Sequence, residues 1–314
     1  MNTILSRTDL AEDARYYEYT SAVNPHLPPV PIELYKSKLH RTGPTRIIPL
    51  DLSSQLGCAG PATGPTVSAS YLRICPNESL TTTSSASAQL YYVIRGKGRS
   101  ESEYGVIEWR PGDVFVLPES GPVKHLAEDD TALYHVNDEP LVTYLSSKPA
   151  SPSFEPVLYP GDRILSELKK VSEEPGATTR NRDAIILGNP TMRQIKSATP
   201  TLWAAIVLMN PGEVQRPHRH NSIAVDIIIS AEPGSYTLLG NAVDDEGNII
   251  NPHRVDWESQ AAFVTPPHLW HGHYNESGKP AMVMAVQDAG FYEHIRTLNI
   301  QFTGLKTTGR EYKA

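Results

Sequence analysis

Two clusters of histidines are the residues in this sequence best suited to chemistry. The first is Pro217-His218-Arg219-His220, and the second ends the run Pro266-Pro267-His268-Leu269-Trp270-His271-Gly272-His273. Six of the eleven histidines lie between positions 218 and 273. Because imidazole is the side chain that proteins use most often to bind metals, this clustering predicts a metal site.

The spacing within each cluster suits a β-strand. Alternate side chains of a strand share a face, so His218 and His220 would point the same way and could converge on one ion. A neighbouring strand lies about 4.8 Å away, close enough to supply a third histidine. His271 and His273 also share a face by this rule. The alternative is a set of hydrogen-bonded core histidines without a metal.

The sequence around the clusters predicts an all-β fold. Short apolar runs separated by turn residues recur in both halves of the chain, at 67–74, 89–94, 106–109, 113–117, 132–136 and 141–145, and again at 184–187, 203–209, 225–230, 235–239, 262–265 and 281–286. Strands at such even spacing are typical of sandwiches and barrels. The two halves look like a weak internal repeat of one barrel.

A length of 314 residues predicts two domains. We expect an irregular N-terminal arm over 1–60, a first barrel over 61–150, a linker with a short helix over 151–182 and a second barrel over 183–314. The arm would pack on a barrel or on a second subunit. We therefore expect a homo-oligomer.

Composition narrows the classes of partner. The net charge is −7 with acidic and basic residues interspersed, so we expect no binding to nucleic acid or to an anionic membrane. No run approaches the ~20 apolar residues of a membrane helix, and the first residues lack a secretory signal, which predicts a cytoplasmic protein. We expect Cys58 and Cys75 to be two thiols rather than a disulfide.

The motifs resemble those of the cupin superfamily, in which a His-x-His strand is followed by a Pro-Gly-Asp…Pro…His strand pair. The first half keeps Pro111-Gly112-Asp113 and a later His125, but residues 81–87 contain no histidine where the His-x-His would stand. The second half has both parts. The resemblance implies two cupin barrels (double-stranded β-helix, or jelly-roll, folds) joined by a short helical linker, the first metal-free and the second metal-binding.

The second half is most similar to the bicupins of the gentisate and salicylate 1,2-dioxygenase group. The likeness is good over roughly 180–300 and is carried by residues 199–206, Pro211-Gly212-Glu213, the first histidine cluster and Trp270-His271-Gly272-His273. It is looser over 60–150. The complete motif stands in the second half here, whereas typical members carry it in the first.

The resemblance implies a role for each site residue. His218, His220 and His271 would bind Fe(II), with Mn, Ni or Zn as alternatives, and His273 would hydrogen-bond the substrate or transfer a proton. Trp203 would form a pocket wall and Arg182 would help hold the substrate. The alternatives are a structural His273, a core Trp203 and a solvated Arg182.

Three positions depart from the dioxygenase pattern. Asp226 stands where the family has an arginine that pairs with the substrate carboxylate, Val207 replaces a polar pocket residue, and Ala285 replaces an acidic one. A buried aspartate would repel an anionic substrate. Asp226 would therefore either bind the metal as a fourth ligand or line the pocket and receive an amine or hydroxyl of the substrate.

These residues predict a non-haem Fe(II) dioxygenase that uses O₂ to cleave a small hydroxylated or amino-substituted aromatic ring, with a substrate other than gentisate. Two alternatives remain open. One is a metal-dependent cupin isomerase, lyase or decarboxylase without O₂ chemistry, and the other is a cupin that binds a small molecule without turnover.

Overall fold

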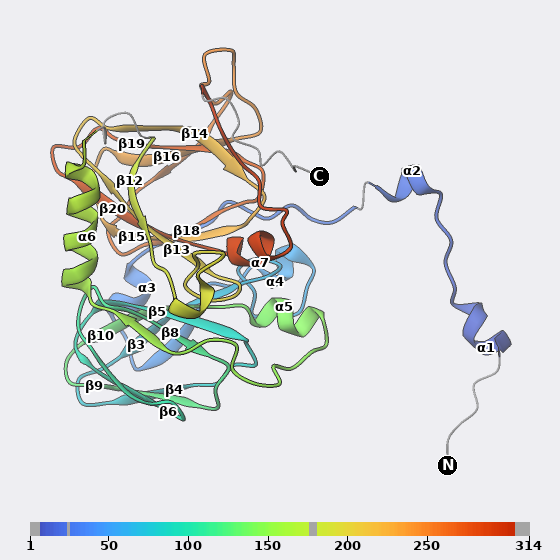
Figure 1. Ribbon diagram of the computed structural model, residues 1–314, viewed down its shortest axis with the longest axis horizontal. Coiled ribbons are helices and arrows are strands. Elements are labelled where there is room, and N and C mark those ends of the chain that lie inside the picture. Colours follow the sequence, from blue (N-terminus) through green and yellow to red (C-terminus); the bar gives the residue numbers. More distant parts are fainter. Residues whose placement is uncertain (1–6, 24–25, 176–180, 305–314) are drawn as a thin grey trace.

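The apolar runs form the strands of two β-barrels (Figure 1). The structure is a computed structural model that describes residues 7–23, 26–175 and 181–304. Residues 1–6, 24–25, 176–180 and 305–314 belong to the predicted arm, linker and second barrel, and they lie outside the described residues.

The first barrel consists of a six-stranded sheet and a four-stranded sheet. In spatial order, the six strands are β11 (Val157–Tyr159), β8 (Val114–Pro118), β5 (Ala88–Arg95), β10 (Thr131–Asn137), β3 (Ser68–Ile74) and β2 (Arg46–Pro49). The four are β4 (Ser79–Thr82), β9 (Val123–Ala127), β6 (Gly98–Ser102) and β7 (Gly105–Trp109). All of the pairings are antiparallel.

The second barrel repeats this plan. Its six-stranded sheet has the order β1 (Leu34–Tyr35), β18 (Ala262–Thr265), β15 (Ala224–Ser230), β20 (Ala281–Gln287), β13 (Trp203–Met209) and β12 (Asp183–Ile186). The opposite sheet has the order β17 (His253–Asp256), β16 (Ser235–Gly240), β19 (Trp270–Asn275), β14 (Val214–His220) and β21 (Ile300–Phe302). Both histidine clusters therefore lie in one sheet, on adjacent strands.

The central strands of the two six-stranded sheets are buried on both faces. Along β5, Leu90 and Tyr92 belong to the apolar core shared by the two barrels, whereas Tyr91 and Val93 belong to the core inside the first barrel. Strand β15 behaves in the same way, since Val225 enters the shared core. Sheets covered on both sides have nearly continuous apolar sequences, which is why these strands stand out in the sequence.

Eight short helical segments join or flank the strands in the described part of the chain. They are α1 (Arg7–Glu12), α2 (Tyr19–Ala22), α3 (Lys38–Arg41), α4 (Ser53–Leu56), α5 (Glu139–Tyr144), α6 (Gly161–Glu173), α7 (Ala289–His294) and the 3₁₀ turn η2 (Pro190–Met192). The helix expected in the linker is α6, which packs against β12. None of the described helices has the length and apolar character needed to cross a membrane.

The prediction of a strand over 141–145 is wrong, because these residues lie in and just after α5. A short apolar run fits a buried helix as well as a strand. The preceding residues favour the helix, since Pro140 stands in its first turn and Glu139 complements its N-terminal dipole.

Two segments predicted to be irregular contribute strands to the barrels. From the arm, β1 pairs with β18 of the second barrel and β2 pairs with β3 of the first. From the linker, β11 pairs with β8. These strands have two to four residues, too few for a period-two pattern to stand out.

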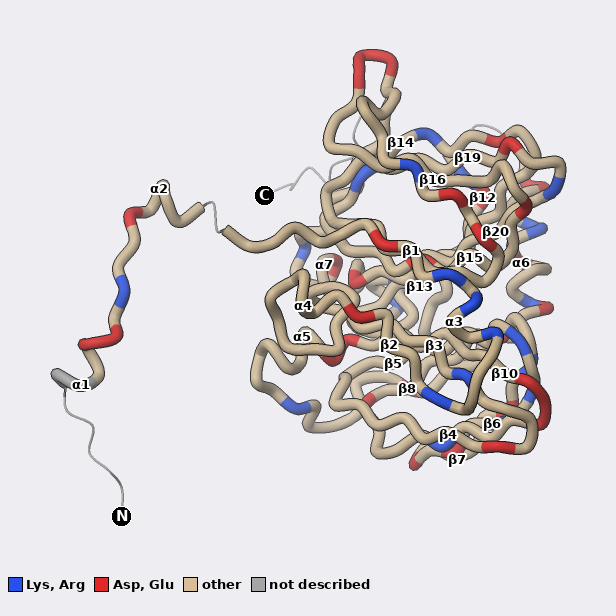
Figure 2. Tube along the Cα trace, turned by 180° about the vertical axis from the view of Figure 1, so that it is seen from behind, with Lys and Arg blue, Asp and Glu red and all other residues tan. Residues whose placement is uncertain are grey.

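The part of the arm that carries α1 and α2 extends away from both barrels (Figures 1 and 2). Its tyrosines are almost fully exposed, with 91% of Tyr16, 76% of Tyr17 and 83% of Tyr19 accessible. Acidic and basic residues alternate over the barrels (Figure 2). Cys58 and Cys75 are free thiols, as the sequence predicts.

Candidate metal centre

Strands β14 and β19 bring the two histidine clusters together, with His218 opposite His271. Between Gln215 and His218 the register shifts, since Pro217 lacks an amide donor and interrupts the ladder. Gly272 permits the close approach of this bulge, because a Cβ there would lie 3.1 Å from the Gln215 carbonyl oxygen and 3.3 Å from Pro217 Cγ. A side chain at position 272, between the two histidines of this cluster, would therefore press against the bulge.

His218, His220 and His271 form a compact buried cluster. One nitrogen from each ring lies within 4.8 Å of the other two, and all three side chains are about 3% exposed. Among the residues that the structure describes, this is the one group of three or more His, Cys, Asp or Glu side chains close enough to share an ion.

Backbone carbonyls fix the orientation of two of these rings. His220 Nδ1 lies 2.8 Å from the Ser222 carbonyl oxygen, and His271 Nδ1 lies 2.9 Å from that of Leu269. A carbonyl only accepts, so both Nδ1 atoms carry the proton and both Nε2 lone pairs remain free. The Nε2 atom of His220 is buried and has no hydrogen-bond partner among the described residues, so its lone pair is available to a metal ion.

Burial also keeps the cluster neutral. It lowers the pKa of His220 to about 4 and holds the pKa values of His218 and His271 well below their usual range, and neighbouring histidines and Arg182 lower them further. Neutral imidazole is the metal-binding form. Three neutral, converging rings therefore fit a transition-metal ion such as Fe(II), Mn, Ni or Zn.

A cavity of about 30 Å³ adjoins the cluster. Four other predicted site residues line it, namely Arg182, Val207, Asp226 and His273. Trp203, the predicted pocket wall, is not among the residues that line it. Trp203 shares the inward face of β13 with Val207 by parity, but it stands at the first position of that strand, beyond the cavity.

Asp226 is a buried acid that lies outside the histidine cluster. Its Oδ2 accepts a 2.7 Å hydrogen bond from Thr265, while Oδ1 is buried and has no partner within the described part of the chain. Burial raises the pKa of Asp226 to about 7, although the Thr265 hydroxyl and Arg182 oppose the rise. Because Asp226 does not join the ligand cluster, the geometry favours its role as a pocket residue over that of a fourth ligand.

Arg182 lies against the ring of His218, with Nη2 3.0 Å from Nδ1 and 3.2 Å from Nε2. Its guanidinium also lies 5.7 Å from the ring centre of Phe302, which stacks on His218. Burial lowers the pKa of Arg182 to about 10, and the Asp226 charge opposes this. At neutral pH Arg182 is a cation that faces the cavity together with Asp226.

Register shows what stands at the same positions in the first barrel. His125 faces Ser100 on β6 just as His273 faces Thr237 on β16. With His125 and His273 matched, Val123 takes the place of His271, and Thr82, which faces Val123, takes the place of His218. The first barrel thus carries a threonine and a valine where the second carries two members of its cluster.

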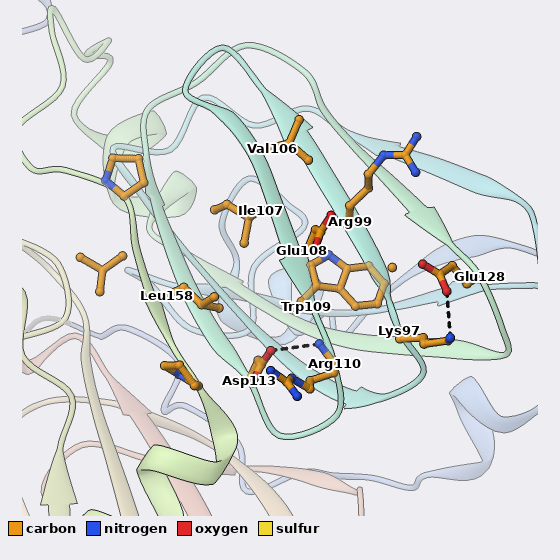
Figure 3. A pocket seen from close by; sticks show the side chains of 14 residues that line it. Lys97, Arg99, Val106, Ile107, Glu108, Trp109, Arg110, Asp113, Glu128 and Leu158 are labelled. Carbon is orange, nitrogen blue, oxygen red and sulfur yellow. Dashed lines mark hydrogen bonds and ion pairs between the residues drawn. The ribbon is translucent and has the colours of Figure 1, made fainter.

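A wider cavity lies elsewhere. It has a volume of about 930 Å³ and is formed by β7, β11 and their neighbours on the outside of the first barrel (Figure 3). Lys97 and Glu128, which line it, form a 3.0 Å ion pair with each other, and Asp113 accepts a hydrogen bond from the Arg110 amide. It holds no ligating cluster, so the small cavity in the second barrel is the better candidate for chemistry.

Sequence reasoning missed several residues around the site. Gln287 lines the cavity, Thr265 bonds Asp226, and Phe302 stacks on His218. The alternation of β18 and β20 was a usable signal for Thr265 and Gln287. Phe302 had none, because β21 has only three residues.

Comparison with solved structures identifies the architecture. Salicylate 1,2-dioxygenase from Pseudaminobacter salicylatoxidans superposes with a TM-score of 0.73 over 95% of this chain and 97% of its own, at 15% sequence identity. The protein has the bicupin fold. An oxalate decarboxylase variant from Bacillus subtilis matches less closely, with a TM-score of 0.53 over 78% of this bicupin and 73% of its own chain, at 14% identity.

Sequence comparison relates part of the bicupin to ring-cleaving dioxygenases. Gentisate 1,2-dioxygenase 1 of Aquipseudomonas alcaligenes is 32% identical over 108 residues, and 5-aminosalicylate 1,2-dioxygenase of Comamonas sp. is 36% identical over 88. These segments cover 34% and 28% of this chain, but only 28% and 23% of the relatives' own lengths. No protein-family model matches the sequence.

Proposed function

We propose that this bicupin is a non-haem Fe(II) dioxygenase that cleaves the ring of a small hydroxylated or amino-substituted aromatic compound. The observation that carries the proposal is the buried cluster of neutral histidines beside a cavity that contains a cation and an acid. The partial identity to 5-aminosalicylate and gentisate 1,2-dioxygenases supports it.

His218, His220 and His271 would hold the iron, with Mn, Ni or Zn as the alternatives. When bound, the iron would supply the redox chemistry that adds both atoms of O₂ to the ring. The protein supplies fixed geometry and a dry pocket. Val207 and Ala285 line that pocket with apolar surface and so help to exclude water.

Arg182 and Asp226 would choose and orient the substrate. Arg182 would pair with a carboxylate or phenolate, and the free Oδ1 of Asp226 would accept a hydrogen bond from an amine or hydroxyl. A second arginine at position 226 would favour a further anionic group, whereas an acid disfavours it. We therefore propose a substrate other than gentisate, such as an aminophenol, a hydroquinone or an amino-substituted hydroxybenzoate.

Substrate binding would require the site to open. A cavity of about 30 Å³ has room for water but not for an aromatic ring, since sites for small organic ligands measure about 300–1,000 Å³. Arg182 and Phe302, which lie against His218, are the side chains whose displacement would enlarge it.

Oxygen uptake tests the proposed reaction. The protein is loaded anaerobically with Fe(II) and mixed with air-saturated buffer and each member of a panel containing gentisate, salicylate, 5-aminosalicylate, aminophenols and hydroquinones. We expect stoichiometric O₂ consumption and a ring-opened product with at least one amino-substituted member, and weaker turnover of gentisate. If iron stays bound and no member consumes O₂, the proposed activity is wrong.

The second candidate function is a metal-dependent isomerase, lyase or decarboxylase without O₂ chemistry. This candidate is included because an oxalate decarboxylase shares the fold. The same panel separates the two, because this alternative predicts turnover under argon. A cupin that only binds a small molecule would show neither.

Three further expectations belong to this proposal. The first barrel would bind no metal, because its matched positions carry Thr82 and Val123. The exposed arm would pack on a second copy of the chain to form a homo-oligomer. The reaction would take place in the cytoplasm, as the sequence predicts.

A further inference from the structure

A chain of hydrogen bonds leads from the wall of the second barrel to His273. Trp257 Nε1 donates a 2.8 Å bond to Thr237 Oγ1, and Thr237 Oγ1 lies 2.9 Å from His273 Nδ1. Thr237 is fully buried and Trp257 is 5% exposed. His273 lines the cavity beside the histidine cluster, and its Nε2 atom has no hydrogen-bond partner among the described residues.

The hydroxyl of Thr237 decides which nitrogen of His273 carries the proton. An indole N–H only donates, so it occupies an acceptor position of the hydroxyl oxygen. The hydroxyl proton then needs an acceptor, and His273 Nδ1 is the one candidate within hydrogen-bond distance in the described part of the chain. If Nδ1 carried a proton instead, the buried hydroxyl proton would be left unpaired.

The first barrel contains the same arrangement. Trp109 Nε1 donates a 2.9 Å bond to Ser100 Oγ, which lies 2.8 Å from His125 Nδ1. His125 Nε2 lies 3.1 Å from Thr82 Oγ1. The bonds are mutually consistent when Ser100 donates to Nδ1 and Nε2–H donates to Thr82.

The two arrangements differ in the residue that lies beside Nε2 of the histidine. In the first barrel its acceptor is Thr82, and His218 stands at the matched position of the second barrel. A ring committed to the metal cluster offers no equivalent acceptor. The N–H of His273 is therefore left facing the cavity.

We propose that Trp257 and Thr237 are positioning residues that hold His273 in its Nε2–H form, so that His273 presents a hydrogen-bond donor to an oxygen of the ligand and does not act as a base through Nε2. The assignment of the proton stands on the hydrogen bonds alone. The identity of the ligand as an aromatic substrate rests on the proposed function.

Nitrogen NMR of histidine tests the protonation directly. The full-length protein is labelled with ¹⁵N-histidine and loaded with Zn(II), which is diamagnetic, and the His273 signals are assigned by their loss in His273→Gln. We expect Nε2 to be protonated and Nδ1 to be an unprotonated acceptor. A protonated Nδ1 in the wild-type protein would overturn the proposal.

Variants of the positioning residues provide the matched comparison. Thr237→Val removes the hydroxyl at nearly constant volume, and Trp257→Phe removes the N–H, so both should produce a mixture of the two neutral forms. Thr237→Ser should keep the wild-type pattern, because a serine hydroxyl, that of Ser100, makes the corresponding hydrogen bond in the first barrel. Ser100→Ala should change the signals of His125 alone. An unchanged His273 spectrum in Thr237→Val contradicts the proposal.

Kinetics give an independent readout if the proposed dioxygenase activity is found. When wild type and variant have equal iron content and melting temperature, Thr237→Val should lower kcat/KM by about 10- to 100-fold. This is the range for the loss of one hydrogen bond to a group that carries or develops a charge. Thr237→Ser should restore it. Equal losses in both variants would contradict the positioning role. Absence of any activity would count against the proposed function while leaving the NMR result to decide the protonation.

Discussion

At the scale of single residues, the site combines neutral ligands with two opposed charges. Burial keeps the rings of the histidine cluster neutral at neutral pH, while Arg182 and Asp226 remain able to interact with a ligand's polar groups. In the proposed function the cluster and the charged pair therefore have separate tasks. The former would hold an ion and the latter would select what binds beside it.

Removal of one ligand tests the first task. We expect His271→Ala to lower metal affinity by more than about 100-fold, since the loss of even a hydrogen-bond partner of a metal ligand costs about 10- to 100-fold. His268→Asn is the matched control, because His268 lies three residues away, is exposed, and has a φ of 66° that asparagine tolerates. Metal analysis of both variants measures the effect. Full metal occupancy in His271→Ala would show that His271 is not a ligand.

Substitution of the acid tests the second task. We expect Asp226→Asn to leave metal content unchanged and to lower kcat/KM for an amino-substituted substrate by about 10- to 100-fold relative to a substrate without the amine, the range for a hydrogen bond to a charged group. The measurement is a ratio of specificities on one preparation. Loss of the metal in this variant would instead support a fourth, carboxylate ligand.

Strand parity predicted that His218 and His220 share a face and that His271 and His273 share a face, and all four side chains line one cavity. Parity gave Trp203 the inward face of β13 but did not show that it stands at the first position of the strand, apart from the residues that line the cavity. Parity could not predict the contact of Thr237 with His273, because the two residues are 36 positions apart in the sequence. Such contacts depend on strand order and register, which the sequence does not display.

At the scale of secondary-structure elements, two buried carboxylates tie the barrels to each other. Asp288, which follows β20, accepts a 2.6 Å bond from Thr66, and Asp138, which follows β10, accepts a 2.9 Å bond from Thr201. Each bond joins one barrel to the other. The pair is thus a further expression of the internal repeat.

Asp288 should make stability depend on pH. Burial raises the pKa of Asp288 from 3.8 to about 6, although hydrogen bonds from Thr66 and the Ile223 amide oppose the rise. A carboxyl with a raised folded-state pKa is most favourable below its unfolded pKa, and its ionisation destabilises the fold as the pH rises from about 4 to about 6. The resulting loss of unfolding free energy between low and neutral pH approaches about 3 kcal/mol.

Comparison of the wild type with Asp288→Asn isolates the contribution of Asp288 to the pH dependence of stability. From pH 4 to pH 7, we expect the free energy of unfolding of the wild type to fall by up to about 3 kcal/mol relative to the variant. Urea unfolding at fixed metal content measures it. Asp162→Asn, at an exposed position, should show no such trend. A constant difference between wild type and Asp288→Asn across this range would contradict the explanation.

The strands buried on both faces were predictable from sequence, and β13 and β18 match the predicted runs residue for residue. The strands with one exposed face were harder. Examples are β6 and β9, which alternate buried and exposed residues and contain polar side chains such as Ser100 and His125 inside the barrel. Those polar residues form hydrogen bonds inside the barrel. Because they occupy inward positions that are usually apolar, the alternation typical of a strand is hard to see in the sequence.

At the scale of the whole molecule, one barrel serves as a scaffold for the other. The shared apolar core joins the two six-stranded sheets, and the first barrel keeps the Trp-hydroxyl-His arrangement without the cluster. The clearest unpartnered feature in the described part of the chain is the extended arm with its exposed tyrosines (Figure 2). Exposed aromatic groups of this kind mark interaction surfaces.

Deletion of the arm tests its role in assembly. We expect the wild-type protein to have a native mass that is a multiple of the 34.6 kDa chain, and deletion of residues 1–26 to reduce that multiple. Light scattering after size-exclusion chromatography measures both. Tyr144→Ser, which alters an exposed aromatic residue outside the arm, is the control and should leave the mass unchanged. A wild-type monomer would rule out this role for the arm.

The central claim is that His218, His220 and His271 hold one iron ion, and elemental analysis of the natively purified protein tests it most directly. The account predicts about one iron per chain in the wild type and almost none in His271→Ala, as expected for a site of three protein ligands. Zinc or nickel at about one per chain, with no iron, would contradict it.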